Sequence, residues 1–288
     1  MASTQQLKSR IRSVKSTRQI TKAMELVAAS KMRRAQEAAK ATSVYAQAAF
    51  ELLTFLATRG ATDGHRLFTK REVKSRLIIV VTSNKGLAGA YNANVMKRYI
   101  QLLHEDDAAN IRNETIAIGR KGAQFVTRLK DTVIGGVYEN LSERPTGSEV
   151  RAIMATVVEK FVSGEVDAVD VIYTEYINSI NQKVTSQRLL PAGFTEVEVG
   201  PEITQARFEP SNSEVLEGAT QRLVEAQIFQ ALLDATASEH SMRMVAMKNA
   251  TDNANDLVDD LTLEMNKVRQ AAITQELAEI SSGAEAVS

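Results

Sequence analysis

The chain has 288 residues, 44% of them hydrophobic and 24% charged, which is the composition of a folded globular protein and excludes a disordered one. It has no cysteine and only three histidines, which excludes disulfides, thiol nucleophiles and cysteine metal sites and argues against a zinc site. The 35 basic and 35 acidic residues cancel overall but not locally. Residues 1–40 hold ten basic and two acidic residues (+8), and residues 251–288 hold two basic and eight acidic residues (−6). We therefore expect the two ends to meet each other or charged partners.

Residues 1–59 contain no glycine or proline, and this interval is far longer than an average helix of about three turns. Small and apolar residues recur at alternating steps of three and four, which predicts one long helix with a coiled-coil seam. The seam residues are Ala28, Met32, Ala35, Ala39, Thr42, Ala46, Ala49, Leu53 and Leu56. Upstream, Leu7, Ile11 and Val14 begin a seam, and Ile20, Met24 and Val27 are expected to continue it on a slightly rotated face.

Residues 60–210 hold all four prolines and most of the glycines. Short runs of β-branched residues alternate with helical patterns, which predicts a mainly parallel sheet with helices on both sides and a hairpin near its end. The expected strands are 76–83, 115–119, 132–137, 169–176 and 183–191, with 196–199 a weaker candidate. The expected helical segments are 93–104, 121–129 and 148–162.

Residues 219–282 again lack glycine and proline, and their apolar spacing from Leu216 keeps one register for about nine heptads. The simplest arrangement pairs this helix antiparallel with the N-terminal one, with the middle as a separate globular body at one end. A bundle folded within the chain is disfavoured, because bundles need short loops and some 150 residues separate the helices. The predicted fold class is therefore α/β with a long antiparallel coiled coil. The predicted domains are an N-terminal coiled-coil helix (1–59), a central α/β domain (60–210) and a C-terminal coiled-coil helix (211–288).

No stretch of the sequence indicates a catalytic or metal site. The turn TSNKGLAGA (82–90) follows a strand and precedes a helix, but it lacks both the GxxxxGK[ST] and the GxGxxG spacing, so a tight turn is favoured over a phosphate loop. GRKG (119–122) is too short to specify a site. His240 falls on the seam and is expected to be a packed histidine. The aspartates of residues 252–260 lie on a continuous helix without an EF-hand glycine, so they are expected to form a solvated or partner-facing surface.

Nucleic-acid binding is also considered, because a basic helix leading into a coil is the plan of a basic zipper. The basic residues alternate with the seam instead of preceding it, and stacking aromatic residues are absent there. No nucleic acid is therefore expected as a partner.

Three long blocks of the sequence resemble the γ subunits of bacterial F-type ATP synthases. They are RQITKAMELVAASKMRRAQ (18–36), ASEHSMRMVAMKNATDNA (237–254) and NKVRQAAITQELAEI (266–280). The similarity also covers GLAGAYNANV (86–95) and the segment ending in SQRLLP (186–191). The turn departs from the family, which commonly has an Asp-Arg pair and a cysteine where this chain has Asn84, Lys85 and Ala88.

The resemblance implies a rotor shaft without catalytic residues, a non-catalytic but required subunit. The implied partners are a ring of three α and three β subunits around the coil, and the ε subunit and the membrane c-ring at the globular base. ATP, ADP and Mg²⁺ would be bound by the α and β subunits, and this chain would bind no cofactor or metal. The implied location is the cytoplasmic face of the plasma membrane, as a peripheral protein. No apolar run reaches the ~18 residues of a membrane span, which agrees with that location.

The resemblance also implies contact residues, carried over by position in the matching blocks. Arg269, Gln270, Thr274 and Glu276 match residues at the tip of the shaft that hydrogen-bond to loops of α and β. Lys22, Met24 and Glu25 match the segment facing the acidic lever of β. Two further function classes remain open, a stand-alone coiled-coil scaffold or nucleic-acid-binding dimer, and a nucleotide-dependent enzyme that uses the α/β domain.

Overall fold

The computed structural model describes residues 4–58, 65–130, 132–139, 141, 145–193 and 212–287. By internal contacts it divides into two units, described separately below. The first unit comprises residues 1–28 and 243–288, and the second comprises residues 29–242. The weak strand candidate at 196–199 lies outside the described residues.

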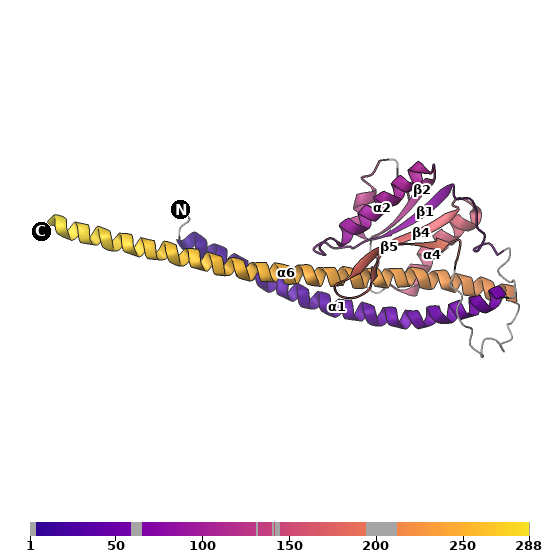
Figure 1. The fold of residues 1–288 in the computed structure, drawn as a ribbon, viewed down its shortest axis with the longest axis horizontal. Coiled ribbons are helices and arrows are strands. Elements are labelled where there is room, and N and C mark those ends of the chain that lie inside the picture. Colours follow the sequence, from indigo (N-terminus) through magenta and orange to yellow (C-terminus); the bar gives the residue numbers. More distant parts are fainter. Residues whose placement is uncertain are drawn as a thin grey trace. The chain divides into compact units, whose positions relative to one another are not determined.

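Two long helices account for both ends of the chain (Figure 1). Helix α1 runs from Thr4 to Thr58 and helix α6 from Asn212 to Val287, with 55 and 76 residues. Their length follows from the sequence, because the breakers that end helices are absent from residues 1–59 and 219–282. The long N- and C-terminal helices predicted from the sequence are thus confirmed.

In the first unit, α1 and α6 pair antiparallel around a small apolar core. Leu7 and Ile11 from α1 are buried against Val258 and Leu261 from α6. Two polar contacts give the direction of the pair, since Arg18 Nη1 donates to Asn255 Oδ1 (3.0 Å) and the hydroxyl oxygens of Thr21 and Thr251 lie 2.8 Å apart. Residue numbers therefore fall on α6 as they rise on α1, as the sequence predicts.

The seam of α1 differs from the prediction at Ile20 and Val27. Both side chains are exposed, at 58% and 54%, whereas Thr21 and Ala28 are buried. Leu7, Val14, Thr21 and Ala28 follow at intervals of seven, so one heptad frame continues without rotation. The apolar pattern alone was misleading here because the seam passes through a threonine whose hydroxyl is satisfied across the helix pair.

The second unit is built on a five-stranded sheet of order β3-β2-β1-β4-β5. The strands are β1 (Ser75–Val81), β2 (Arg112–Ile118), β3 (Val133–Tyr138), β4 (Ala168–Tyr176) and β5 (Gln182–Leu190). The first four strands are parallel, and β5 pairs antiparallel with β4. The central strand β1 is apolar because helices cover both faces of the sheet, which leaves no solvent-facing side. The mainly parallel sheet and its terminal hairpin are confirmed.

Each face of the sheet has its own helical layer (Figure 1). Helices α2 (Tyr91–Ala108) and α3 (Arg120–Val126) cover one face, with Val95, Tyr99 and Ala123 in that core. Helix α4 (Gly147–Ser163) covers the other face, and a capping box at Thr146 starts it.

Helix α6 shares the core on the α4 side of the sheet. Val224, Ile228, Leu232 and Ala235 pack in the same cluster as α4 and the strands. The middle of the chain is therefore not the separate body expected from the sequence. Helical spacing shows that a helix has an apolar face, but it does not show whether a helix or a sheet covers that face.

Candidate functional site

The residues implied by the resemblance form two groups, both in the first unit. Lys22, Met24 and Glu25 lie on α1 close to the Thr21–Thr251 contact. The other group begins at Arg269 on α6, some 18 residues beyond Thr251, which is roughly 27 Å along a helix at about 1.5 Å per residue. The structure therefore keeps the two groups apart as separate surfaces.

The α1 group combines an ion pair with apolar surface. Lys22 Nζ donates to both carboxylate oxygens of Glu25 at 3.0 Å, with the lysine side chain 55% exposed and that of Glu25 15% exposed. Met24 is half-buried beside them. Ile20, Leu26 and Val27 are each more than half exposed, although none of them contributes to the seam. Ile20 and Val27, seven residues apart, lie on the same side of the helix and leave apolar surface exposed there.

The α6 group lies on helix that α1 does not cover. Arg269, Gln270, Thr274 and Glu276 are all exposed, and every residue whose burial is described from 269 to 282 is exposed. The apolar core of the helix pair ends at Met265 and Val268, whose side chains pack against it and are only partly buried. The final turns of α6 therefore extend beyond the paired part of the coil.

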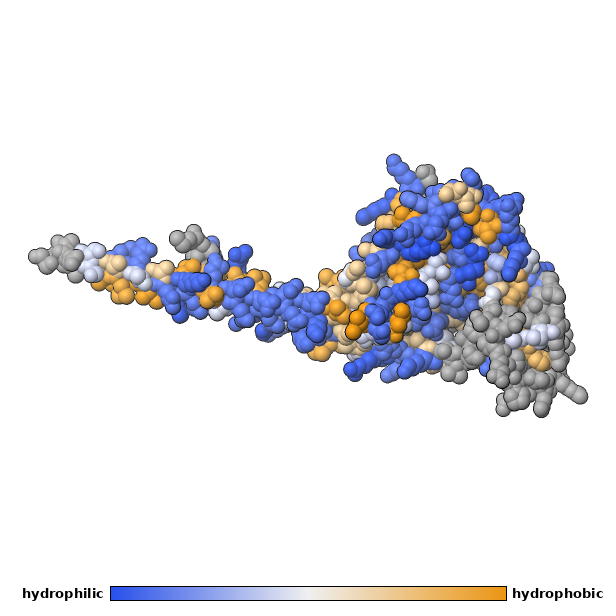
Figure 2. Space-filling model, in the orientation of Figure 1, coloured by the Kyte–Doolittle hydropathy of each residue, from blue (hydrophilic) through white to orange (hydrophobic). Residues whose placement is uncertain are grey.

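This free end of α6 carries an apolar stripe. Ile273, Leu277 and Ile280, at spacings of four and three, are 48%, 63% and 69% exposed and so lie along one side of the helix. Hydrophobic residues at the surface of this part of α6 are also visible in Figure 2. Sequence reasoning did not single these residues out, although their helical spacing was the available signal.

The turn at 82–90 uses its polar side chains to hold the fold together. Thr82 Oγ1 accepts from the Gly122 N–H (2.7 Å), and Asn84 Oδ1 accepts from the Arg120 N–H (3.1 Å). Asn92 Oδ1 accepts from the Ser83 N–H (3.0 Å). These bonds join the ends of β1 and β2 to α2 and α3, which is the tight strand-to-helix turn favoured from the sequence.

The remaining polar candidates have structural surroundings. His240 is 4% exposed, in its expected packed position, and Asp252, Asp256, Asp259 and Asp260 are all exposed. Among the residues that the structure describes, no group of three or more histidine, aspartate or glutamate side chains is arranged to hold a metal ion. None of the described helices is long and apolar enough to cross a membrane.

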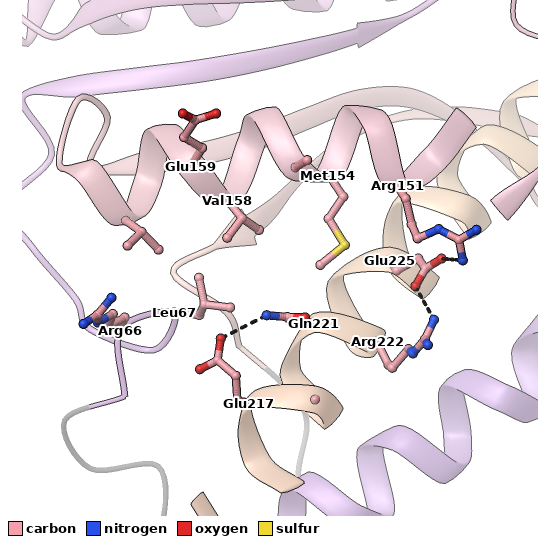
Figure 3. Close-up of a pocket in the computed structure, with 13 residues that line it drawn as sticks. Arg66, Leu67, Arg151, Met154, Val158, Glu159, Glu217, Gln221, Arg222 and Glu225 are labelled. Carbon is pink, nitrogen blue, oxygen red and sulfur yellow. Dashed lines mark hydrogen bonds and ion pairs between the residues drawn. The ribbon is translucent and has the colours of Figure 1, made fainter. Parts of the chain in front are cut away.

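An open cavity of about 850 Å³ lies between α4 and the start of α6 (Figure 3). Leu67, Met154 and Val158 form its apolar wall. Glu225 lies 2.9 Å from Arg222 and 3.9 Å from Arg151. Three arginines and three glutamates line the cavity, so the charges of its lining balance.

Known proteins resemble the whole chain. The profile of a family described as ATP synthase matches residues 3–287. The ATP synthase gamma chain of Roseiflexus castenholzii is 43% identical over 289 residues, covering 100% of this chain and 99% of the relative. That of Macrococcus caseolyticus is 40% identical over 288 residues, covering all of both chains. This chain belongs to the ATP synthase gamma chain family.

Solved structures agree with the fold of the family. A chain from the mitochondrial ATP synthase of Euglena gracilis, in a complex described as OSCP, F1 and c-ring, matches with a TM-score of 0.67 and 20% identity. It covers 99% of this chain and 94% of the solved chain. A chain from the central stalk and c-ring of the Tetrahymena thermophila mitochondrial enzyme matches with a TM-score of 0.58 and 24% identity. That match covers 80% of this chain and 99% of the other.

Proposed function

We propose that this chain is the central rotor stalk of a proton-transporting ATP synthase and transmits rotation between a membrane c-ring and an α3β3 ring. The observation that carries the proposal is the end of α6, where a continuous helix leaves its partner and exposes Ile273, Leu277 and Ile280. A surrounding protein would remove this apolar surface from water. Membership of the gamma chain family makes the α3β3 ring the natural candidate.

The coupling requires a stiff shaft with unlike sides. Continuous helices without internal breakers resist bending, so torque applied at one end reaches the other. The sides of the first unit differ, with an ion pair and aliphatic residues near Lys22 and an acidic face from 252 to 260. A turning asymmetric surface would favour a different conformation in each β subunit in turn, and so a different nucleotide affinity.

The proposal assigns a role to each part of the chain. Residues 1–59 and 211–288 would form the shaft, and residues 60–210 would form most of the base that meets the ε subunit and the c-ring. Lys22, Met24 and Glu25 would contact the lever of β, and Arg269, Gln270, Thr274 and Glu276 would contact loops of α and β. The chain itself would be non-catalytic, with ATP, ADP and Mg²⁺ held by the α and β subunits, and the complex would sit on the cytoplasmic face of the membrane.

Subunit stoichiometry tests this function against its rivals. The rotor proposal predicts by native mass spectrometry one copy of this chain per three α–β pairs, and ATP-driven proton pumping by the reconstituted complex. A chain that is recovered only as a free homodimer and leaves pumping unaffected when omitted would support the scaffold or nucleic-acid-binding alternative. ATP turnover by the purified chain alone would support the enzyme alternative.

A further inference from the structure

A second cavity, of about 460 Å³, lies within the second unit where α1, α6 and the turn between β4 and β5 meet. Residues from all three segments line it. They are Gln36, Ala39 and Lys40 from α1, Tyr176, Ile177, Asn178 and Ser179 from the strand end and turn, and Gln230, Asp234 and Ala237 from α6. A group placed here would therefore touch both long helices at once.

The α6 wall of this cavity holds a buried oxygen atom that lacks a donor. Gln230 Nε2 donates to Asp234 Oδ1 at 3.1 Å, which orients the two side chains together. Gln230 Oε1 is buried and has no hydrogen-bond partner. Over the part of the chain that the structure describes, Asp234 is in no ion pair. A buried acceptor without a donor is costly, so this wall favours a hydrogen-bond donor, above all a cationic one.

The other titratable groups around Asp234 do not supply positive charge. Tyr173 and Glu175 face it from β4, and Glu175 accepts from Thr185 Oγ1 on β5 at 3.2 Å. Burial raises the pKa of Asp234 to about 6. The hydrogen bond from Gln230 lowers this pKa, and the negative charge of Glu175 raises it further. Burial, with the nearby charges of Asp234 and Glu175, raises the pKa of Tyr173 to about 12, so this phenol stays neutral. An ionised Asp234 therefore needs a cation from the cavity side.

Lys40 is the cation among the described residues that line the cavity. It comes from α1, opposite the α6 wall, and its flexible four-carbon stem can move an ammonium group by several ångströms. We propose that the ammonium group of Lys40 enters the cavity and pairs with Asp234, forming a latch between α1 and α6 that closes when Asp234 is ionised and opens when it is protonated. The latch does not depend on the proposed rotor function, because it acts within this chain.

The latch adds an ion pair between α1 and α6 whose strength depends on pH. In the closed state Lys40 donates to Asp234 and can reach the unpaired Gln230 oxygen. In the open state a neutral carboxyl group no longer attracts the ammonium group, so Lys40 no longer contributes to holding the α1 segment around Gln36.

Hydrogen exchange of the full chain tests the latch. At about pH 8 we expect Lys40→Met to speed exchange of the amides of residues 36–42 about threefold relative to the unsubstituted chain, and at about pH 5 to leave it unchanged, because only an ionised Asp234 holds the ammonium group. In an Asp234→Asn background Lys40→Met should have no effect at either pH, and Lys40→Arg should exchange like the unsubstituted chain. Lys31→Met is the matched control, because Lys31 lies on the same helix but lines a different cavity.

A second measurement keeps the test independent of helix opening. With ¹³C-labelled aspartate, Lys40→Met should raise the pKa of Asp234 by about half a unit, or about threefold in proton affinity, and Lys31→Met should leave it unchanged. Equal shifts in both variants, or none, would overturn the latch, as would equal exchange of the unsubstituted chain and Lys40→Met at about pH 8. Helical circular dichroism shows whether each variant is folded, and the lysine variants decide the question if Asp234→Asn does not fold.

Discussion

Thr21 and Thr251 show how single polar residues set the register of the long helix pair. Both are 8–9% exposed on a seam that is otherwise mostly aliphatic, and their hydroxyl oxygens lie 2.8 Å apart. Each hydroxyl group also lies within hydrogen-bond distance of a carbonyl oxygen of its own helix, Thr21 at Arg18 and Thr251 at Met247. Slipping the pair by one heptad would separate the threonines and bury them against apolar side chains, so they favour one alignment.

We expect Thr21→Val and Thr251→Val each to lower the free energy of unfolding by about 1 kcal/mol, because each leaves the other hydroxyl with an apolar neighbour. The double variant should lose less than the sum of the two. A double-mutant cycle from denaturant unfolding measures this coupling. Strict additivity would show that the two hydroxyl groups do not interact.

Met24→Lys should impair coupling more than assembly. It adds a charge beside Lys22 on a surface proposed to move against β, and the half-buried Met24 does not belong to the apolar core of the pair. We expect about a twofold or greater fall in protons pumped per ATP hydrolysed, with unchanged subunit stoichiometry. Gln19→Lys, at an exposed position on the same helix, is the control. Normal pumping per ATP in Met24→Lys would show that the assigned role of Met24 is wrong.

Asp234 should make stability depend on pH in a direction opposite to that of most carboxylates. Its folded pKa of about 6 exceeds the ordinary value of 3.8, so its contribution is full below pH 3.8 and is lost as pH rises through about 6. Asp234→Asn should therefore raise the free energy of unfolding at about pH 8, by about 1–3 kcal/mol. The gain should fall at the lower end of that range if Lys40 closes on the carboxylate. Unfolding by denaturant at about pH 5 and pH 8 measures the difference, and a loss of stability at pH 8 would contradict it.

At the scale of elements, α6 is one helix with three successive surroundings. Its first part packs on the sheet through Val224 and Leu232, its middle pairs with α1 through Val258 and Leu261, and its last part is exposed. The helix stays continuous because no glycine or proline interrupts residues 219–282, although its apolar face meets different partners. A single continuous element thus runs from the hydrophobic core beside the sheet to an exposed end.

Removing residues 269–288 should leave the stability of the remaining chain almost unchanged, because the described side chains of this segment are exposed. Leu261→Ala, in contrast, should lower the melting temperature of the coil by several degrees, since truncating a buried leucine costs about 2–5 kcal/mol. Thermal melting followed by circular dichroism compares the two variants. A larger loss from the deletion than from Leu261→Ala would show that the end of α6 packs against the rest of the chain.

At the scale of the whole molecule, the base and the shaft share a helix and also share a core. Val224, Ile228 and Leu232 of α6 lie in the cluster formed by α4 and the strands. Nearer the start of the helix, Leu216 and Leu223 of α6 pack on Leu53 and Leu56 of α1. A division of the chain by glycine and proline content therefore describes its sequence segments, whereas the hydrophobic core crosses the boundary near residue 211.

A fragment of residues 60–210 should fail to fold cooperatively, because it lacks the α6 side chains that complete the core on the α4 face. We expect it to bind a hydrophobic dye and to melt broadly. A fragment of residues 60–242 restores those side chains and should melt more sharply and bind less dye. Cooperative unfolding of the shorter fragment would show that α6 is dispensable to the sheet domain.

The sequence by itself determined the two long helices, their antiparallel seam and the alternation of strands and helices in the sheet domain. Breaker positions and apolar periodicity act locally, so they can be read directly from the order of residues. It also determined the family, through the long blocks at both ends. Only the tertiary structure decided that Thr21 takes the place expected for Ile20, that α6 completes the core of the sheet, and that the end of α6 leaves its partner. These features depend on which surfaces meet and on whether a buried polar group finds a partner, and periodicity does not contain that information.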